Sequence, residues 1–135
     1  MGDVVVTVPK NFKAENYWDR DDFDYSARGL AAWISEGDLP GTEATDVDTE
    51  WCFSLGGNRP NIKPGERVYI VCEGKLRGYA PLLYIDDLAD GRYGLIRSTG
   101  AVAVTIDEPI RGFQGFRYRW WDREDEKPFP DWKVA

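Results

Sequence analysis

The stretch GGNRPNIKPGERVYIVCEGKLRGYAPLLYIDD, residues 56–87, decides the fold because it encodes a complete β-hairpin preceded by turn residues. Its first third is rich in Gly, Pro and Asn, which favour turns. The β-branched and apolar segment 67–73 predicts a strand, Gly74 marks a tight turn, and 76–86 predicts the returning strand.

The returning strand contains Gly78 and Pro81, which are unusual inside an ordinary flat strand. They predict a bulge or a sharp bend, as at the corner of a β-barrel. Working outward from this hairpin, the apolar or alternating runs predict further strands over residues 3–9, 49–55, 95–98, 101–106 and 111–121.

One helix is expected before the strands, over residues 26–41. Ser26 is a candidate N-cap, an apolar stripe recurs at helical spacing, and Gly37 stands where a C-terminal glycine belongs. An early helix followed by bent strands predicts an α+β, mainly β fold: a small bent-strand barrel with one or two helices against it. We expect a single domain over 1–135, with 14–26 as a loop insertion and 122–135 as a charged tail.

Charge is distributed unevenly along the chain. The net charge is −7, but residues 1–50 carry 12 acidic and 4 basic side chains, whereas residues 51–121 carry 10 basic and 7 acidic ones. A negative molecule repels polyanions at long range, yet a local basic face can still contact phosphate. The acidic run 19–24 lacks the ligand order of an EF-hand and is interpreted as solvated.

The residue inventory limits the chemistry. There is no histidine, which removes Ser-His-Asp and Cys-His catalysis, and two cysteines without histidine make a structural zinc site unexpected. We expect no cofactor or metal, a reduced Cys52 and a buried, inert Cys72. The first residues lack a signal-peptide pattern and no apolar run is long enough for a membrane helix, so we expect a cytoplasmic monomer with no membrane partner.

The order of ISEGD, KPGERVYIV, GKLRGYAPL and AVAVTIDEPI, over residues 4–118, resembles that of PUA-like domains, the superfamily that includes the ASCH and EVE branches. The resemblance implies a small β-barrel that binds RNA, DNA or a modified base in a cleft beside the barrel. ASCH members usually carry a Gly-x-Lys-x-x-Glu-x-Arg signature, and ISEGDLPG stands in its place here. The resemblance therefore implies binding rather than ASCH-type hydrolysis.

The segment RGFQGFRYRWWDRE, residues 111–124, raises the main functional question. Alternation along a strand would place Phe116, Tyr118 and Trp120 on an apolar inward face, with two arginines and Trp121 on the other face. Arginine stacks on rings and binds phosphate, so this outer face is a candidate contact strip. The alternative is a structural strand whose arginines pair with nearby acids, namely Asp107, Glu108, Asp122 and Glu124.

Further arginines and aromatic residues alternate near Gly78, where a ligand could approach the backbone closely. If they converge, they form a pocket with an aromatic wall and a basic rim that holds a single-stranded or modified base, or a nucleotide, by stacking. The candidate ligand-binding residues are Trp51, Arg77, Tyr79, Arg97, Arg117, Arg119 and Trp121.

Two other function classes stay open. A small hydrolase of the same superfamily, acting on a nucleoside or RNA, needs a lysine, a carboxylate and a hydroxyl in one cleft, with Lys10 as the candidate amine and Glu36, Asp38 or Glu73 as its partner. A protein-interaction module with an acidic surface would use the acidic first third of the chain, or an apolar patch near Phe129 and Trp132.

Overall fold

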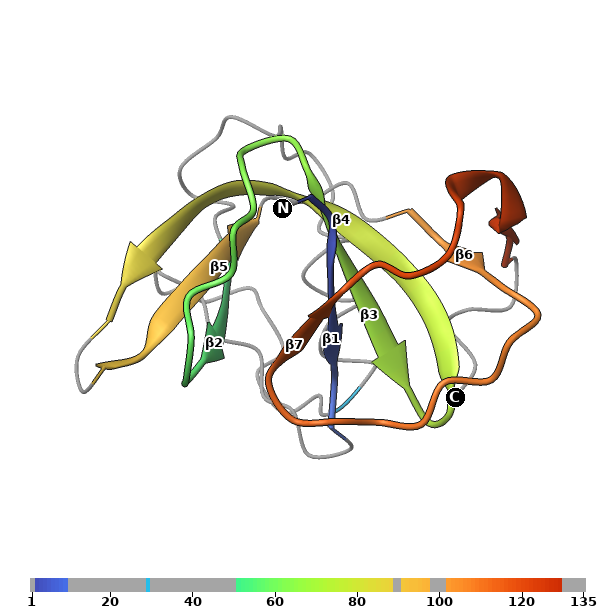
Figure 1. Cartoon of the computed structure of the whole chain (residues 1–135), viewed down its shortest axis with the longest axis horizontal. Helices are drawn as coiled ribbons and strands as arrows, with labels where there is room; N and C mark the ends of the chain where they lie inside the picture. The colour runs from blue at the N-terminus through green and yellow to red at the C-terminus, as the bar shows by residue number, and fades with distance from the viewer. Residues whose placement is uncertain (1, 10–28, 30–50, 89–90, 98–101, 130–135) are drawn as a thin grey trace, which may run out of the picture.

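A computed structural model of the protein describes residues 2–9, 29, 51–88, 91–97 and 102–129. This part of the chain is mainly β (Figure 1). Its strands are β1 (Val4–Thr7), β2 (Trp51–Leu55), β3 (Arg67–Cys72), β4 (Lys75–Asp87), β5 (Tyr93–Arg97), β6 (Val104–Thr105), β7 (Phe116–Tyr118) and β8 (Lys127–Pro128), with one 3-10 turn, η3 (Arg123–Asp125). The helix expected over 26–41 lies outside the described residues.

Six strands form one sheet in the order β2-β5-β4-β3-β1-β7, and the sheet curls into a half-barrel (Figure 1). The long strand β4 belongs to both halves, because Lys75–Pro81 pairs with β3 and Leu82–Asp87 pairs with β5. All these pairs are antiparallel except β1 with β3, which is parallel. The mainly β fold and the predicted hairpin are confirmed.

The predicted irregularity of β4 is also confirmed. Ile70 pairs with Gly78 and Val71 with Leu76, so Arg77 is an extra residue in the ladder. A second shift lies between Leu82 and Tyr84 in the pairing with β5. Each bulge bends the strand and increases its twist, which allows one strand to join the two halves of a curled sheet.

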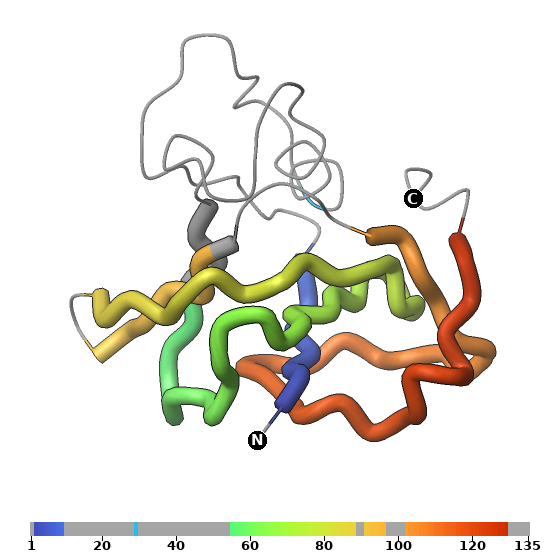
Figure 2. Tube along the Cα trace, turned by 90° about the horizontal axis from the view of Figure 1, so that it is seen from above, coloured from blue at the N-terminus to red at the C-terminus, as the bar shows by residue number. Residues whose placement is uncertain are grey.

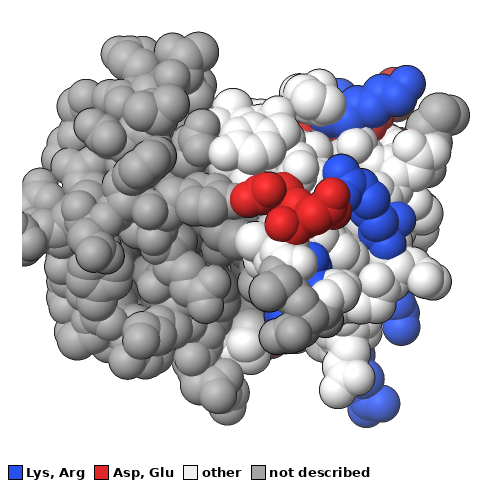
Figure 3. Space-filling view, turned by 90° about the vertical axis from the view of Figure 1, so that its left-hand side faces the viewer, with Lys and Arg blue, Asp and Glu red and all other residues white. Residues whose placement is uncertain are grey.

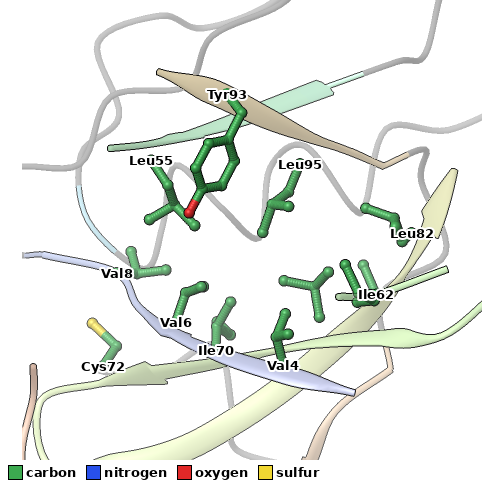
Figure 4. Close-up of a cluster of buried hydrophobic side chains, with 12 residues drawn as sticks. Val4, Val6, Val8, Leu55, Ile62, Ile70, Cys72, Leu82, Tyr93 and Leu95 are labelled. Carbon is green, nitrogen blue, oxygen red and sulfur yellow. The ribbon is translucent and has the colours of Figure 1, made fainter. Parts of the chain in front are cut away.

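The concave side of the sheet holds the larger core. Val4 and Val6 of β1 and alternate residues of β3 point toward Leu55, Tyr93 and Leu95 across the curl (Figure 4). The convex side of β1 and β3 holds a second cluster, which includes Val5, Tyr69 and the buried Trp121. β1 is covered on both faces, so its three valines are 0% exposed. This explains why its sequence is a continuous apolar run and does not alternate with polar residues.

Two predicted strands are much shorter than expected. Of the described residues 102–106, Val104–Thr105 form a strand, which pairs with β8 in a separate two-stranded sheet. Within 111–121 only Phe116–Tyr118 pairs with β1. The segments that contain β6 and β8 consequently lie side by side at one end of the sheet (Figures 1 and 2). Phe129, in the described part of the charged tail, packs partly against the concave core.

Candidate nucleic-acid interface

Arg77 lies inside the protein because of the bulge that contains it. Its side chain is 4% exposed, its Nε donates a hydrogen bond to the Cys72 carbonyl oxygen at 3.0 Å, and its guanidinium lies 5.6 Å from the centre of the Phe129 ring. A buried arginine that satisfies a carbonyl at the end of its own hairpin has a structural role. Sequence alternation could not reveal this, because a bulge resets which face each residue takes.

The space beside Gly78 is occupied by the protein itself. A Cβ atom built on Gly78 would lie 2.5 Å from the carbonyl oxygen of Val102, and Val102 forms an isolated bridge with Tyr79. The expectation that a ligand approaches the backbone at Gly78 is therefore wrong. The Tyr79 ring lies half-buried against Tyr69 at 5.2 Å, under the guanidinium of Arg67 at 4.1 Å.

Arg119 binds a carboxylate that the sequence did not suggest. Its Nε donates to Oδ2 of the buried Asp3 at 3.0 Å, and Arg123 Nη2 donates to the same oxygen at 2.8 Å. The backbone N–H of Arg67 donates to the other oxygen, Oδ1, at 2.9 Å. Burial acts to raise the pKa of Asp3, but these hydrogen bonds outweigh it and hold the pKa below its usual value of 3.8.

The four acids named above as partners for the two arginines of this strip do not fill that role among the described ion pairs. Asp107 pairs with Lys127, Glu108 accepts the indole N–H of Trp120, and Arg119 binds Asp3 at the other end of the chain. The structural interpretation of Arg119 is therefore supported, but with a distant partner that local sequence cannot indicate.

Trp121 belongs to a second buried network. It is 7% exposed, its ring meets Tyr69 edge-on at 5.2 Å, and its Nε1 donates to Glu126 at 2.9 Å. Glu126 also accepts hydrogen bonds from the Tyr69 hydroxyl and from Arg67 Nη1, the latter at 3.0 Å. Burial and the adjacent Glu126 carboxylate raise the pKa of Tyr69, which keeps this hydroxyl a proton donor.

The aromatic faces of residues 116–121 are partly the reverse of the sequence expectation. Tyr118 is 40% and Trp120 is 42% exposed, whereas Trp121, expected outside, is buried. Only Phe116 packs partly against the concave core as expected. The alternation fails because the strand ends at Tyr118 and the chain then turns to bring Trp121 over Tyr69.

Arg117 keeps an outward position on β7. Its side chain is exposed and its guanidinium lies 4.4 Å from the centre of the Phe113 ring. Two contacts hold Phe113 in place. Its backbone N–H donates to the Thr7 hydroxyl at 3.0 Å, and its ring packs against the convex cluster. No ion pair holds Arg117 or the exposed Arg111 among residues 2–9, 51–88, 91–97 and 102–129.

The remaining two candidates, Trp51 and Arg97, are directly opposite each other in the β2–β5 ladder. Their side chains lie outside the described atoms. β2 and β7 stand at opposite ends of the strand order, so the ladder itself does not bring these two residues to Arg117. The seven candidates thus fall into three groups. Four contact other parts of the protein, namely Arg77, Tyr79, Arg119 and Trp121; Arg117 points outward from β7; and Trp51 and Arg97 form a pair in the ladder.

Two adjoining pockets, which the sequence did not reveal, are lined by residues 105–109 and by parts of the C-terminal segment. One of about 410 Å³ is lined by Ile106, Asp107, Glu108, Trp121, Glu124, Asp125, Glu126 and Lys127. The other, of about 300 Å³, is lined by Glu73, Gly74, Lys75, Thr105, Ile106, Asp107, Glu108, Pro109 and Phe129. The acidic runs around 107–108 and 122–126 were the available signal, but only the pairing of β6 with β8 brings them together.

The second pocket contains the residue types that the hydrolase hypothesis requires, namely Lys75, Glu73 and Thr105. Their contacts do not form a catalytic arrangement in the described structure. The Thr105 hydroxyl faces the neighbouring Ile106 carbonyl at 3.4 Å, and no described hydrogen bond joins it to Lys75. Lys10, Glu36 and Asp38 lie outside the described residues.

The charge of the described surface is locally segregated. Figure 3 shows a band of Lys and Arg side chains along one margin of this face, next to a compact group of carboxylates. Across the described ranges, no helix is long and apolar enough to cross a lipid bilayer. No protein-family model, no curated protein and no solved structure matches this chain.

Proposed function

We propose that the protein is a non-catalytic nucleic-acid-binding module and that its contact surface is the outer edge of the sheet at β7, which we call the β7 edge: Arg111, Phe113, Arg117 and Tyr118. The observation that carries this proposal is the exposed Arg117 guanidinium stacked 4.4 Å above Phe113. A stacked guanidinium is held in one plane while its N–H groups remain available to fork onto phosphate oxygens.

Two exposed rings of the same stretch favour a single-stranded ligand: Tyr118, on the face of β7 opposite to Arg117, and Trp120, just after the strand. Tyr118 and Trp120 are 40% and 42% exposed, and unpaired bases can stack on such faces for about 1–3 kcal/mol per base. A duplex offers no free base faces to them. A modified base or a nucleotide would use the same ring-and-guanidinium chemistry.

The net charge of −7 sets the expected strength of binding. The field of the whole molecule opposes a polyanion at long range, so the β7 edge must act over short distances. We expect modest affinity that weakens steeply with salt.

We also propose a PUA-like fold. It is supported by the order of sequence motifs over 4–118, by the curled half-barrel sheet and by the predicted bends of β4. Nucleic-acid binding beside the barrel is what that resemblance implies, and the two proposals support each other without depending on each other.

The test is fluorescence anisotropy with labelled single-stranded RNA, single-stranded DNA and a duplex carrying a modified base, at two salt concentrations. We expect the single strands to bind more tightly at low salt, and Arg117→Ala with Arg111→Ala to weaken binding about tenfold, as expected for two lost phosphate contacts. Lys63→Ala with Lys75→Ala, which removes two exposed positive charges outside the β7 edge, is the matched control and should have little effect. Equal losses in both variants, or no binding at low salt, would reject the β7 edge as the contact surface.

A further inference from the structure

The two acidic pockets adjoin each other, and together we call them the acidic groove. They share Ile106, Asp107 and Glu108, so they meet across this segment. The groove extends from the β3–β4 turn at Glu73 to η3. The pairing of β6 with β8 holds the two segments that line it next to each other. A groove of this kind suits an extended chain better than a compact small molecule.

The walls of the groove combine carboxylates with apolar and aromatic surface. The carboxylates outnumber the two lysines, Lys75 and Lys127, and are Glu73, Asp107, Glu108, Glu124, Asp125 and Glu126. Trp121 lines the larger of the two pockets and Phe129 lines the smaller one. Apolar walls with an acidic rim accommodate the alkyl stems of Lys and Arg while their charged ends meet carboxylates or rings.

The carboxylates differ in how far they are already used. Glu126 is bound to Arg67, Tyr69 and Trp121, and Asp107 is paired with Lys127. Glu108 accepts only from a neutral donor, the Trp120 indole N–H, at 3.2 Å. For Glu108, Glu124 and Asp125 the described part of the chain supplies no cationic partner, so no ion pair neutralises their negative charges.

The spacing of these acids argues against a metal ion. Within the described residues, no three His, Cys, Asp or Glu side chains are placed so that they could hold one. Carboxylates spread along a groove match several separate positive charges instead. A chain with regularly spaced Lys and Arg side chains has this property, whereas a polyanion would be repelled.

We propose that this groove binds a basic, extended peptide segment of a partner protein. Its side chains reach Glu108, Glu124 and Asp125, and their stems pack against the exposed Pro109 and the half-buried ring of Phe129. This activity is separate from the β7 edge, which is basic and lies on residues 111–118. One small domain would then contact a cationic protein segment and an anionic nucleic acid through different surfaces.

The test uses a fluorescein-labelled octapeptide of alternating arginine and alanine, with a citrulline-for-arginine peptide as its neutral counterpart. Wild type is compared with Glu124→Gln/Asp125→Asn in the groove and with Asp86→Asn/Asp87→Asn at the far end of β4, which changes the net charge equally. We expect the groove variant to lose affinity about fivefold or more and the β4 variant less than about twofold. The citrulline peptide should not bind.

Equal losses in the two variants would reduce the interaction to the field of an acidic protein and overturn the proposal. So would the absence of binding at millimolar peptide. The Trp121 indole N–H signal in a nitrogen–proton correlation spectrum provides a second readout, since it should move during the peptide titration and stay fixed with the citrulline peptide. Arg117→Ala should keep the peptide affinity of wild type, which separates this proposal from nucleic-acid binding at the β7 edge.

Discussion

Gly78 shows how a single residue fixes the contact between two segments. Its Cβ position lies 2.5 Å from the Val102 carbonyl oxygen, a backbone atom that cannot rotate away. We expect Gly78→Ala to lower the free energy of unfolding by about 1–3 kcal/mol, because one backbone must move. Urea denaturation measures this. Gly56→Ala, whose Cβ would meet only the flexible end of Arg92 at 3.4 Å, is the control and should change stability by less than about 0.5 kcal/mol.

Glu73 is strained at the tip of the hairpin. It has φ 52° and is followed by Gly74 at φ 83°, so both residues have the positive φ of a type I′ turn. Asn tolerates this conformation better than Glu. We therefore expect Glu73→Asn to raise the free energy of unfolding by about 0.5–1 kcal/mol in urea denaturation. Glu73→Gln removes the same charge without relieving the strain; if it stabilised the protein equally, charge rather than conformation would be the cause.

At the scale of elements, the C-terminal segment is fastened to the sheet by Glu126. Its side chain is 6% exposed and accepts hydrogen bonds from Arg67, Tyr69 and Trp121. Glu126→Gln leaves the Arg67 charge without its partner, and we expect a loss of about 2–4 kcal/mol. Hydrogen exchange should rise first over residues 119–128. Asp122→Asn, at an exposed neighbouring position, is the control; exchange that rises uniformly across the sheet would contradict a local fastening.

Elements defined by local patterns were predictable, and those defined by distant partners were not. The hairpin of β3 and β4 follows from a β-branched run, a glycine turn and an irregular return strand, all within 67–87. β8 and η3 had no such pattern, because a two-residue strand exists only where Ala103 to Thr105 offers it a partner. The same reason explains why 111–121 was predicted too long: its sequence alternates beyond the point at which β1 can pair with it.

At the scale of the whole molecule, the sequence names candidate arginines and aromatic residues but does not say where folding places each of them. Arg117 is exposed beside a ring, as a contact residue would be. Arg77 and Arg119 also alternate with apolar or aromatic residues in the sequence, yet a bulge buries the first and Asp3, from the first described segment, engages the second. Sequence spacing cannot distinguish these three outcomes, since each depends on a contact made by folding.

Asp3 links the beginning of the chain to β3 and to the C-terminal segment, so its ionisation should affect the stability of the whole fold. The pKa of Asp3 is lowered in the folded protein below its usual value of 3.8. A depressed pKa gives stability that is fully present above the unfolded value and is lost as the pH falls through the folded value. We therefore expect Asp3→Asn to be less stable than wild type by about 2–4 kcal/mol at pH 7. The difference should stay constant down to about pH 5 and shrink below about pH 4. Urea denaturation of both proteins from pH 7 to pH 3 measures it, with Asp87→Asn, whose side chain is 83% exposed, as the control. A difference that does not change with pH would mean that the Asp3 carboxylate acts through its shape and hydrogen bonds alone, and that its charge does not hold the two ends of the chain together.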